Sequence, residues 1–260
     1  MNPKLKLVKN LLEKRSARRK EGKFVVEGPH LLEEAGDKVN FIVYCEKLPI
    51  VKKLEEEGVP SIKLSPEQFA ELSGVEAPQG VLGVVRQLGC QFRDVMRGDK
   101  TLIVFCLGVQ DPGNLGTIIR SADAFGASGV ILSKGTVDHY NPKTVRATMG
   151  SLFHLPIVTT EDEKETIEHL KQKNVKIVAT TVSATKNCSE ADLAKSLAIL
   201  VGNEGAGLDP EIVALADEDV NIPMVGQAES LNVGISTAVL LYEALRQKSQ
   251  PSPSGRGGQV

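Results

Sequence analysis

The chain lacks the features of several broad protein classes. It has no tryptophan and only 4% aromatic residues, and its net charge of −2 at pH 7 indicates no overall attraction for nucleic acid. No apolar run approaches the roughly 18 residues of a membrane-spanning helix, and no secretory leader is visible. We therefore expect neither membrane insertion nor export.

Cysteine and histidine are too few and too scattered to indicate a metal centre. The four cysteines form no CxxC pair, and the four histidines form no HExxH motif. One cysteine, Cys106, lies inside an apolar run. We expect reduced thiols in a cytoplasmic protein that holds no metal and no disulfide framework.

Three common catalytic fingerprints are also missing. No GxGxxG motif follows a predicted strand, which disfavours a nicotinamide dehydrogenase of the usual kind. The GxxxxGKS/T motif of P-loop nucleotidases and the GxSxG motif of serine hydrolases are absent as well. A nucleotide-binding oxidoreductase is therefore a disfavoured alternative.

Strands and helices alternate along the chain, which predicts an α/β fold with a parallel sheet covered by helices on both faces. Residues 1–87 are expected to form a small α/β domain, and residues 88–100, which lack periodicity, a linker. A second α/β domain is predicted over residues 101–248. The composition of residues 249–260 (SQPSPSGRGGQV) predicts a disordered tail.

Several helices are marked by local signals. Cap residues predict helix starts at Ser65, Asn141 and Thr160. The last helix, predicted over residues 231–248, is apolar over more of its surface than one core-facing stripe requires. We expect this helix to pack in the core and also against a second subunit.

The amino terminus is basic although the whole chain is not. Residues 1–23 carry nine basic and two acidic residues, a net charge of +7. Apolar residues recur at helical spacing within residues 2–20, so these charges are predicted to lie on a helix. Such a basic arm suits contact with phosphates, and a solvated helix face is the alternative that charge alone leaves open.

Polar side chains gather in or just after three loops that follow predicted strands. Because parallel strands end at one edge of a sheet, ligands bind at such loops, and we expect the three to converge on one crevice. Each residue taken singly also fits a structural role, as a helix cap, a turn residue or an exposed helical residue. These residues are Asn114, Arg120, Glu204, Ser230 and Asn232.

The same loops resemble the three motifs of the SpoU/TrmH RNA 2′-O-ribose methyltransferases. The matching stretches are Asn114–Arg120 (NLGTIIR), Gly202–Gly205 (GNEG) and Ile222–Val233 (IPMVGQAESLNV). They occur in the family's order, and the resemblance covers about residues 100–248. Towards the amino terminus, Phe24–Gly28 (FVVEG) and Gln79–Val81 (QGV) are similar to that family's substrate-binding domain.

The resemblance implies a deep trefoil knot at the carboxyl end, of the SPOUT type. It also implies S-adenosylmethionine as the cofactor and a homodimer whose site draws residues from both subunits. By position, Gly202, Ile222 and Leu231 would hold the cofactor through backbone groups, with Ser230 beside them. Gly234 departs from the pattern, since many members carry serine there, and we expect a looser start of the last helix.

The implied reaction is in-line attack of a ribose 2′-hydroxyl on the cofactor's methyl group. The resemblance gives Arg120 the role of base, but a guanidinium keeps its proton, so stabilising the alkoxide or gripping a phosphate is equally consistent. Glu204 and Asn114 would orient Arg120 and the ribose, and Asn232 would fix its loop or contact the nucleotide. Arg146 is a weaker candidate for phosphate contact, or a surface charge.

The sequence thus favours a ribose methyltransferase that acts on structured RNA, with 23S ribosomal RNA the favoured substrate. A tRNA 2′-O-methyltransferase and a non-catalytic RNA-binding protein on the same fold are the alternatives. Because aromatic residues are few, contacts to phosphates and to RNA shape should dominate over base stacking.

Overall fold

The structure is a computed structural model that describes residues 2–97 and 101–249. Three residues of the predicted linker, 98–100, lie outside the described residues. So does the predicted tail, apart from Ser249. The α/β fold class is confirmed, with a parallel sheet in the carboxyl-terminal part, whereas the knot stays a prediction.

The chain divides into two compact units, and the first is discontinuous. It combines residues 1–89 with residues 138–154. The second combines residues 90–137 with residues 155–260. The chain therefore passes between the units three times, after Gly89, Val137 and His154.

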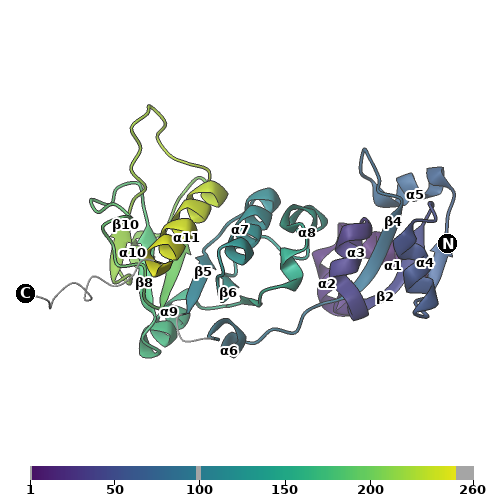
Figure 1. The fold of residues 1–260 in the computed structure, drawn as a ribbon, viewed down its shortest axis with the longest axis horizontal. Helices are drawn as coiled ribbons and strands as arrows, with labels where there is room; N and C mark the ends of the chain where they lie inside the picture. The colour runs from purple at the N-terminus through teal and green to yellow at the C-terminus, as the bar shows by residue number, and fades with distance from the viewer. Residues whose placement is uncertain (1, 98–100, 250–260) are drawn as a thin grey trace, which may run out of the picture. The chain divides into compact units, whose positions relative to one another are not determined.

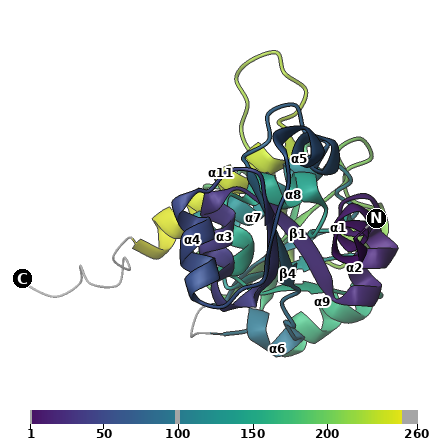
Figure 2. The same ribbon diagram turned by 90° about the vertical axis from the view of Figure 1, so that its right-hand side faces the viewer.

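The first unit contains a four-stranded sheet in the order β1-β4-β2-β3. Strand β4 runs antiparallel to both of its neighbours, and β3 runs parallel to β2. The strands are β1 (Lys23–Glu27), β2 (Val39–Tyr44), β3 (Ser61–Lys63) and β4 (Val81–Arg86). Helices α1 and α2 lie on one side of this sheet, and α3 and α4 lie on the other (Figure 2). The helical elements are α1 (Pro3–Glu13), α2 (Arg15–Glu21), α3 (Pro29–Ala35), η1 (Gly36–Lys38), α4 (Pro49–Glu56) and α5 (Pro66–Ser73).

The single amino-terminal helix predicted from the sequence is in fact two helices. Lys14 separates them, because its backbone is extended (φ −119°, ψ 115°). The break lets the buried Arg18 turn back and donate to the carbonyl of Leu11 at 2.7 Å, a helix-end carbonyl that lacks a partner in its own helix. The same guanidinium pairs with Asp138 at 2.7 Å.

The inserted segment 138–154 is anchored to the first unit by polar contacts. The Tyr140 hydroxyl accepts a hydrogen bond from the backbone N–H of Leu88 at 2.8 Å, and His154 Nε2 lies 2.8 Å from a Glu34 carboxylate oxygen. The segment forms α8 (Pro142–Thr148) and η2 (Ser151–Phe153). The predicted cap of α8 is confirmed, since Asn141 Oδ1 accepts from the N–H of Lys143.

The second unit is built on six parallel strands in the order β10-β8-β9-β5-β6-β7 (Figure 1). They are β5 (Leu102–Cys106), β6 (Gly129–Leu132), β7 (Ile157–Thr159), β8 (Lys176–Thr180), β9 (Leu197–Val201) and β10 (Glu218–Val220). One core cluster joins apolar residues of strands β5 through β9 to α6 (Phe92–Val95), α9 (Glu163–Gln172) and α10 (Pro210–Val213). Helices α7 (Pro112–Ala124) and α11 (Val233–Ser249) pack against each other.

Strand register brings the three polar loops to one edge. The last residue of β5, Cys106, pairs with the last residue of β9, Val201. On the other side of β9, Leu200 pairs with Ala179 of β8, and Val220 of β10 pairs with Thr180. The loops after β5, β9 and β10 therefore all leave the sheet at its carboxyl edge, as predicted.

The predicted cap at Thr160 was wrong. Helix α9 begins at Glu163, and Asp162 caps it by accepting from the N–H of Glu165 at 2.9 Å. The Thr160 hydroxyl instead accepts from the N–H of Asp162 and bonds to the Thr166 hydroxyl at 2.7 Å. The threonine thus fixes the turn before the helix.

Candidate functional site

The glycine-rich turn after β9 is closed by the side chain of Asn203. Its Oδ1 accepts from the N–H groups of Gly205 and Ala206, both at 2.9 Å. Its Nδ2 donates to the carbonyl of Gly108, in the loop after β5, at 2.9 Å. Asn203 therefore ties the second polar loop to the first.

Gly202 is required by the turn's own backbone. A Cβ atom built on Gly202 would lie 2.3 Å from the carbonyl carbon and oxygen of Gly207 and 2.6 Å from the nitrogen of Leu208. Gly202 is buried and does not line the cavity described below. Glycine at this position therefore allows the turn to close.

Glu204 accepts three hydrogen bonds at the carboxyl edge. The donors are the backbone N–H of Gln110 at 3.1 Å, that of Asp111 at 3.0 Å, and Asn114 Nδ2 at 3.0 Å. Partial burial raises the pKa of Glu204, but the hydrogen bonds from Asn114, Asp111 and Gln110 outweigh it and hold the pKa below its ordinary value of 4.5. The carboxylate is therefore ionised at neutral pH and unsuited to act as a base.

Asn114 and Asn232 extend the hydrogen bonds of Glu204 into a network in which each donor and acceptor is fixed. Asn232 Oδ1 accepts from the N–H of Gly234 at 2.9 Å and thereby caps α11. Its Nδ2 then donates to Asn114 Oδ1 at 2.8 Å, and Asn114 Nδ2 donates to Glu204. Each amide orientation follows from the next, so Glu204, Asn114 and Asn232 form one directed network across all three loops.

Arg120 does not join that network. It lies six positions after Asn114 on α7, which corresponds to a rise of about 9 Å and a rotation of about 240°. Arg120 is exposed, and no hydrogen bond or ion pair to its guanidinium is formed within residues 2–97 and 101–249. The exposed face of α7 that carries it also includes Thr117. Arg120 is thus a cation without a protein partner in the described part of the chain.

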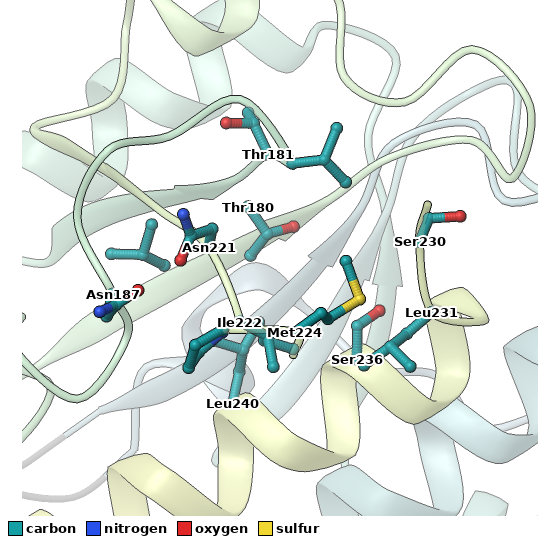
Figure 3. A pocket seen from close by; sticks show the side chains of 13 residues that line it. Thr180, Thr181, Asn187, Asn221, Ile222, Met224, Ser230, Leu231, Ser236 and Leu240 are labelled. Carbon is teal, nitrogen blue, oxygen red and sulfur yellow. The ribbon is translucent and has the colours of Figure 1, made fainter. Parts of the chain in front are cut away.

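A cavity of about 410 Å³ opens beside the loop after β10 (Figure 3). It is lined by three of the predicted cofactor-binding residues, Ile222, Ser230 and Leu231. Pro223 and Met224, which also line it, lie within the stretch Ile222–Val233 singled out in the sequence. The sequence interpretation missed the other lining residues: Thr180, Thr181, Val182, Asn187, Val220, Asn221, Ser236 and Leu240. Thr180 ends β8 and Thr181 follows it, so the rule that ligands bind at carboxyl ends of strands would have found them, whereas nothing in the sequence marks Asn187.

The two amino-terminal stretches singled out in the sequence meet in the first unit. The buried Glu27 accepts from the Ser73 hydroxyl at 3.0 Å and from the N–H of Gln79 at 3.2 Å. A Cβ on Gly28, whose φ is +99°, would lie 1.9 Å from the Gln79 side chain. Arg146 is half-buried, with Nη1 3.9 Å from Glu27 Oε2, so it faces a buried carboxylate.

Membrane-spanning helices and clusters of metal ligands are both absent from the described residues. None of their helices is long and apolar enough to cross a membrane. No three or more of their His, Cys, Asp or Glu side chains group so that they could hold a metal ion.

Two family models and several known proteins are similar to this chain. The model of the SpoU rRNA Methylase family matches residues 101–242, and that of the MRM3-like substrate binding domain matches residues 2–83. The chain is 36% identical to the 23S rRNA (guanosine(2553)-2′-O)-methyltransferase RlmP of Bacillus subtilis, over 93% of this chain and 95% of that protein. It is 33% identical to the 23S rRNA (uridine(2479)-2′-O)-methyltransferase of Streptomyces viridochromogenes, over 92% of this chain and 88% of that protein.

A solved structure is similar over nearly the whole length. The SpoU methyltransferase AviRb from Streptomyces viridochromogenes, in complex with the cofactor AdoMet, matches with a TM-score of 0.86 and 32% identity. The match covers 95% of this chain and 98% of that one, so it includes both compact units.

Proposed function

The chain belongs to the SpoU rRNA methylase family, and from that premise we propose that it methylates a ribose 2′-hydroxyl in 23S ribosomal RNA, with S-adenosylmethionine as the methyl donor. The observation that carries this proposal is the directed network of Glu204, Asn114 and Asn232 beside the cavity lined by Ile222 and Leu231. The match of the amino-terminal unit to a substrate-binding domain favours ribosomal RNA over tRNA.

The cavity suits the proposed cofactor. Its volume of about 410 Å³ falls within the range of small-molecule sites. Apolar side chains such as Val220, Ile222 and Leu240 form part of its wall, and hydroxyl and amide groups such as Thr181 and Ser230 form the rest. This mixture fits a flat base and a ribose, and Ile222 and Leu231 are the residues we expect to hold them.

When bound, S-adenosylmethionine supplies an electrophilic methyl group for transfer to a ribose oxygen. The chain must position that oxygen and favour loss of its proton. Asn114 and Asn232 each retain one amide N–H beyond those used in the network, and these can donate to ribose oxygens. Glu204 holds Asn114 in place, which makes Glu204 a positioning residue.

Arg120 supplies the positive charge of the site. A guanidinium stabilises a developing alkoxide or grips a neighbouring phosphate without losing its proton. Because Arg120 meets no partner in the described part of its own protomer, we infer that it completes the site formed by a second copy of the chain, or binds the RNA directly.

An exposed apolar stripe on α11 supports a homodimer. Four large side chains are 36–54% exposed along one side of the helix, namely Ile235, Val239, Tyr242 and Leu245. The opposite side of α11 is buried, and α11 packs against α7, which carries Arg120. A dimer through this helix pair would cover the stripe and bring Arg120 close to the partner.

The amino-terminal helices supply a surface for RNA phosphates. Within the described residues, seven exposed cations on α1, α2 and the residue between them form no ion pair with an acidic side chain: Lys4, Lys6, Lys9, Lys14, Arg15, Arg19 and Lys20. Unpaired cations on one helix pair favour phosphate contact over a salt-bridged surface. We infer a cytoplasmic location from the proposed substrate and from the four free cysteines.

Transfer of a tritiated methyl group to 23S ribosomal RNA that lacks the modification tests the proposal. Arg120→Ala should lower transfer at least about 100-fold, because one preorganised charge is worth that much, and should leave the affinity for S-adenosylmethionine unchanged. Arg97→Ala, which removes another exposed arginine, is the control. If the wild-type protein binds RNA but neither binds the cofactor nor transfers methyl groups, it is a non-catalytic binding protein.

A further inference from the structure

The loop after β5 is held from two sides by side chains of other loops. Its residue Gly108 has a φ of +76°, a left-handed conformation that favours glycine. The carbonyl of Gly108 accepts from Asn203 Nδ2, in the loop after β9, at 2.9 Å. Its N–H donates to two hydroxyls in the loop after β6, Ser133 Oγ at 3.0 Å and Thr136 Oγ1 at 3.2 Å. Both backbone polar groups of Gly108 are therefore bound by side chains.

The two hydroxyls form a directed chain of hydrogen bonds. Ser133 and Thr136 are buried, with 5% and 3% of their surface exposed. Thr136 Oγ1 donates its one hydrogen to the carbonyl of Cys106 at 3.1 Å, so Ser133 Oγ, 3.4 Å away, is the donor between the two hydroxyls. Thr136 Oγ1 then accepts from Ser133 Oγ and from the N–H of Gly108, which uses its full hydrogen-bonding capacity.

Backbone hydrogen bonds alone already join the loop after β6 to β5 and the loop that follows it. The N–H of Ser133 donates to the carbonyl of Cys106, and that of Val137 donates to the carbonyl of Val109, both at 2.9 Å. The N–H of Gly108, in contrast, has no backbone acceptor among the described residues. Burying hydroxyls is unfavourable unless they are hydrogen-bonded. What the hydroxyl pair adds to the backbone contacts is the fixed position of Gly108.

The segment that follows Gly108 leads directly into the candidate site. The N–H groups of Gln110 and Asp111 supply two of the three hydrogen bonds to Glu204. Asp111 Oδ1 accepts from the N–H of Asn114 at 2.8 Å and thereby caps α7. A shift of the backbone at Gly108 would therefore move both the donors to Glu204 and the start of the helix that carries Asn114.

We propose that Ser133 and Thr136 are positioning residues for methyl transfer. Neither lines the cavity, and neither bonds to the directed network itself. They act through Gly108, which they hold in the one place where Glu204 and Asn114 meet correctly. This inference rests on the proposed function, since it assigns residues to that reaction. It follows that loss of the hydroxyls should slow turnover and leave the affinity for S-adenosylmethionine unchanged.

Two substitutions at Thr136 separate the hydroxyl from the rest of the side chain. Thr136→Val keeps the shape and removes the hydroxyl, whereas Thr136→Ser keeps the hydroxyl and removes a methyl group. In the free full-length protein, amide hydrogen exchange over residues 107–111 should become about fivefold faster in the valine variant. The kcat for methyl transfer to 23S ribosomal RNA, measured below the unfolding transition, should fall about tenfold. Thr136→Ser should restore most of both quantities.

A double-mutant cycle tests whether Thr136 acts through Glu204. In a Glu204→Gln background, Thr136→Val should lower kcat by less than about twofold, because both changes disturb the same contacts. The matched control is Thr166→Val, which removes a buried hydroxyl that bonds to Asp162 and Thr160 at the start of α9. It should leave kcat and the exchange of residues 107–111 unchanged.

Two further variants complete the experiment. Ser133→Ala removes the nearer acceptor of the Gly108 N–H and should change exchange and kcat in the same direction, so the test does not depend on how well Thr136→Val folds. Thr185→Ala changes an exposed residue that does not line the cavity, and should change neither quantity.

The outcomes separate this inference from the function on which it rests. If folded Thr136→Val matches an active wild-type protein in kcat and exchange, or if the serine variant loses as much kcat as the valine variant, the hydroxyl does not position the site. Additive losses in the double-mutant cycle would also overturn the inference. If the wild-type protein transfers no methyl group to ribosomal RNA, the proposed function itself fails, whereas amide exchange still shows whether the hydroxyls hold Gly108.

Discussion

At the scale of single residues, the site depends on hydrogen bonds whose direction is set at both ends. Asn232 must present its oxygen to α11, and Glu204 has only acceptors to offer. Asn114 lies between them and can satisfy both only in one orientation. A change at either end therefore alters what Asn114 presents to a substrate, even if that residue never touches the substrate.

Glu204→Gln should reduce methyl transfer and lower the stability of the fold slightly. Glutamine would place an N–H₂ group against one of the three donors that now bind the carboxylate. We expect a loss of about 1 kcal/mol, because the side chain is exposed and partly screened by water. Thermal unfolding at pH 7 measures this loss, and Thr185→Ala serves as the control.

The difference in stability between the wild-type protein and Glu204→Gln should depend on pH. The folded pKa of Glu204 lies below its ordinary 4.5, so its contribution to stability is present above that pH and is lost as the pH falls through the folded value. The stability difference between wild type and Glu204→Gln should be constant from neutral pH to about pH 5 and shrink in more acidic solution. A difference that grows on acidification would contradict the ionised network.

Asn232 combines two functions that substitutions can separate. Asn232→Ser keeps an oxygen that can cap α11 but loses the donor to Asn114, so it should abolish most methyl transfer at little cost in stability. Asn232→Ala loses the cap as well and should unfold more easily, by about 1 kcal/mol relative to the serine variant. Equal activity of the wild-type and serine proteins would show that the bond to Asn114 is dispensable.

At the scale of elements, the glycines of the turn after β9 differ in how much space the backbone leaves for a side chain. Gly202→Ala would place a Cβ 2.3 Å from the backbone of Gly207, where only backbone movement relieves the overlap. We expect a loss of about 3 kcal/mol or more. Gly205→Ala is the matched control, since its Cβ would meet only Asn203 Oδ1 at an ordinary 3.6 Å. Chemical denaturation of both variants gives the comparison.

A substitution in helix α11 tests the proposed homodimer. Val239 is 36% exposed on the apolar stripe, and Val239→Glu would place a charge in the proposed interface. Light scattering after gel filtration should show a dimer for the wild type and a monomer for the variant, with methyl transfer lost in the monomer. Met149→Glu changes an exposed apolar residue elsewhere and should remain dimeric. A wild-type monomer with full activity would rule out a shared site.

At the scale of the whole molecule, the basic surface of α1 and α2 should dominate the salt dependence of RNA binding. Replacing Lys9, Arg15 and Arg19 by glutamate should weaken binding at least tenfold and reduce the salt slope by about one per residue. The affinity for S-adenosylmethionine should not change. Filter binding at several salt concentrations gives the slope.

The control for this experiment lies in the same unit. Lys52 and Lys53 of α4 and Lys63 of β3 are exposed and form no ion pair within the described ranges, and α4 lies on the other side of the sheet (Figure 2). Reversing these three charges alters the net charge equally. An equal loss of RNA affinity in both triple variants would show that only the total charge matters.

The sequence predicts best what depends on local pattern. Alternating strands and helices, the Asn141 cap and the placement of three polar loops at one edge were all predictable, because each depends on neighbouring residues or on the parallel sheet. The break at Lys14 was not, since the Arg18–Asp138 contact that accompanies it joins residues 120 positions apart. The sequence also did not predict that residues 138–154 belong to the first unit, because their contacts are with residues far away in the chain.

Within the candidate site, the motif residues could be predicted from the sequence better than the residues that line the cavity. Asn114, Glu204 and Asn232 stand next to glycine-rich loops, so their convergence could be predicted from the order of the strands. Asn187 lies in an irregular loop and reaches the cavity only because its backbone bridges to Asn221 after β10. Such a pairing between a loop and a strand end leaves no periodic signal in the sequence.

The insertion of residues 138–154 into the first unit imposes an order on biosynthesis. A ribosome that has translated Gly89 must still translate through Val137 before the inserted segment begins, which takes several seconds at about 5–20 residues per second. During that interval, Arg18 lacks its carboxylate partner and Glu34 lacks the imidazole of His154. The first unit, with its proposed RNA-binding surface, therefore matures only after the first strands of the second unit have emerged.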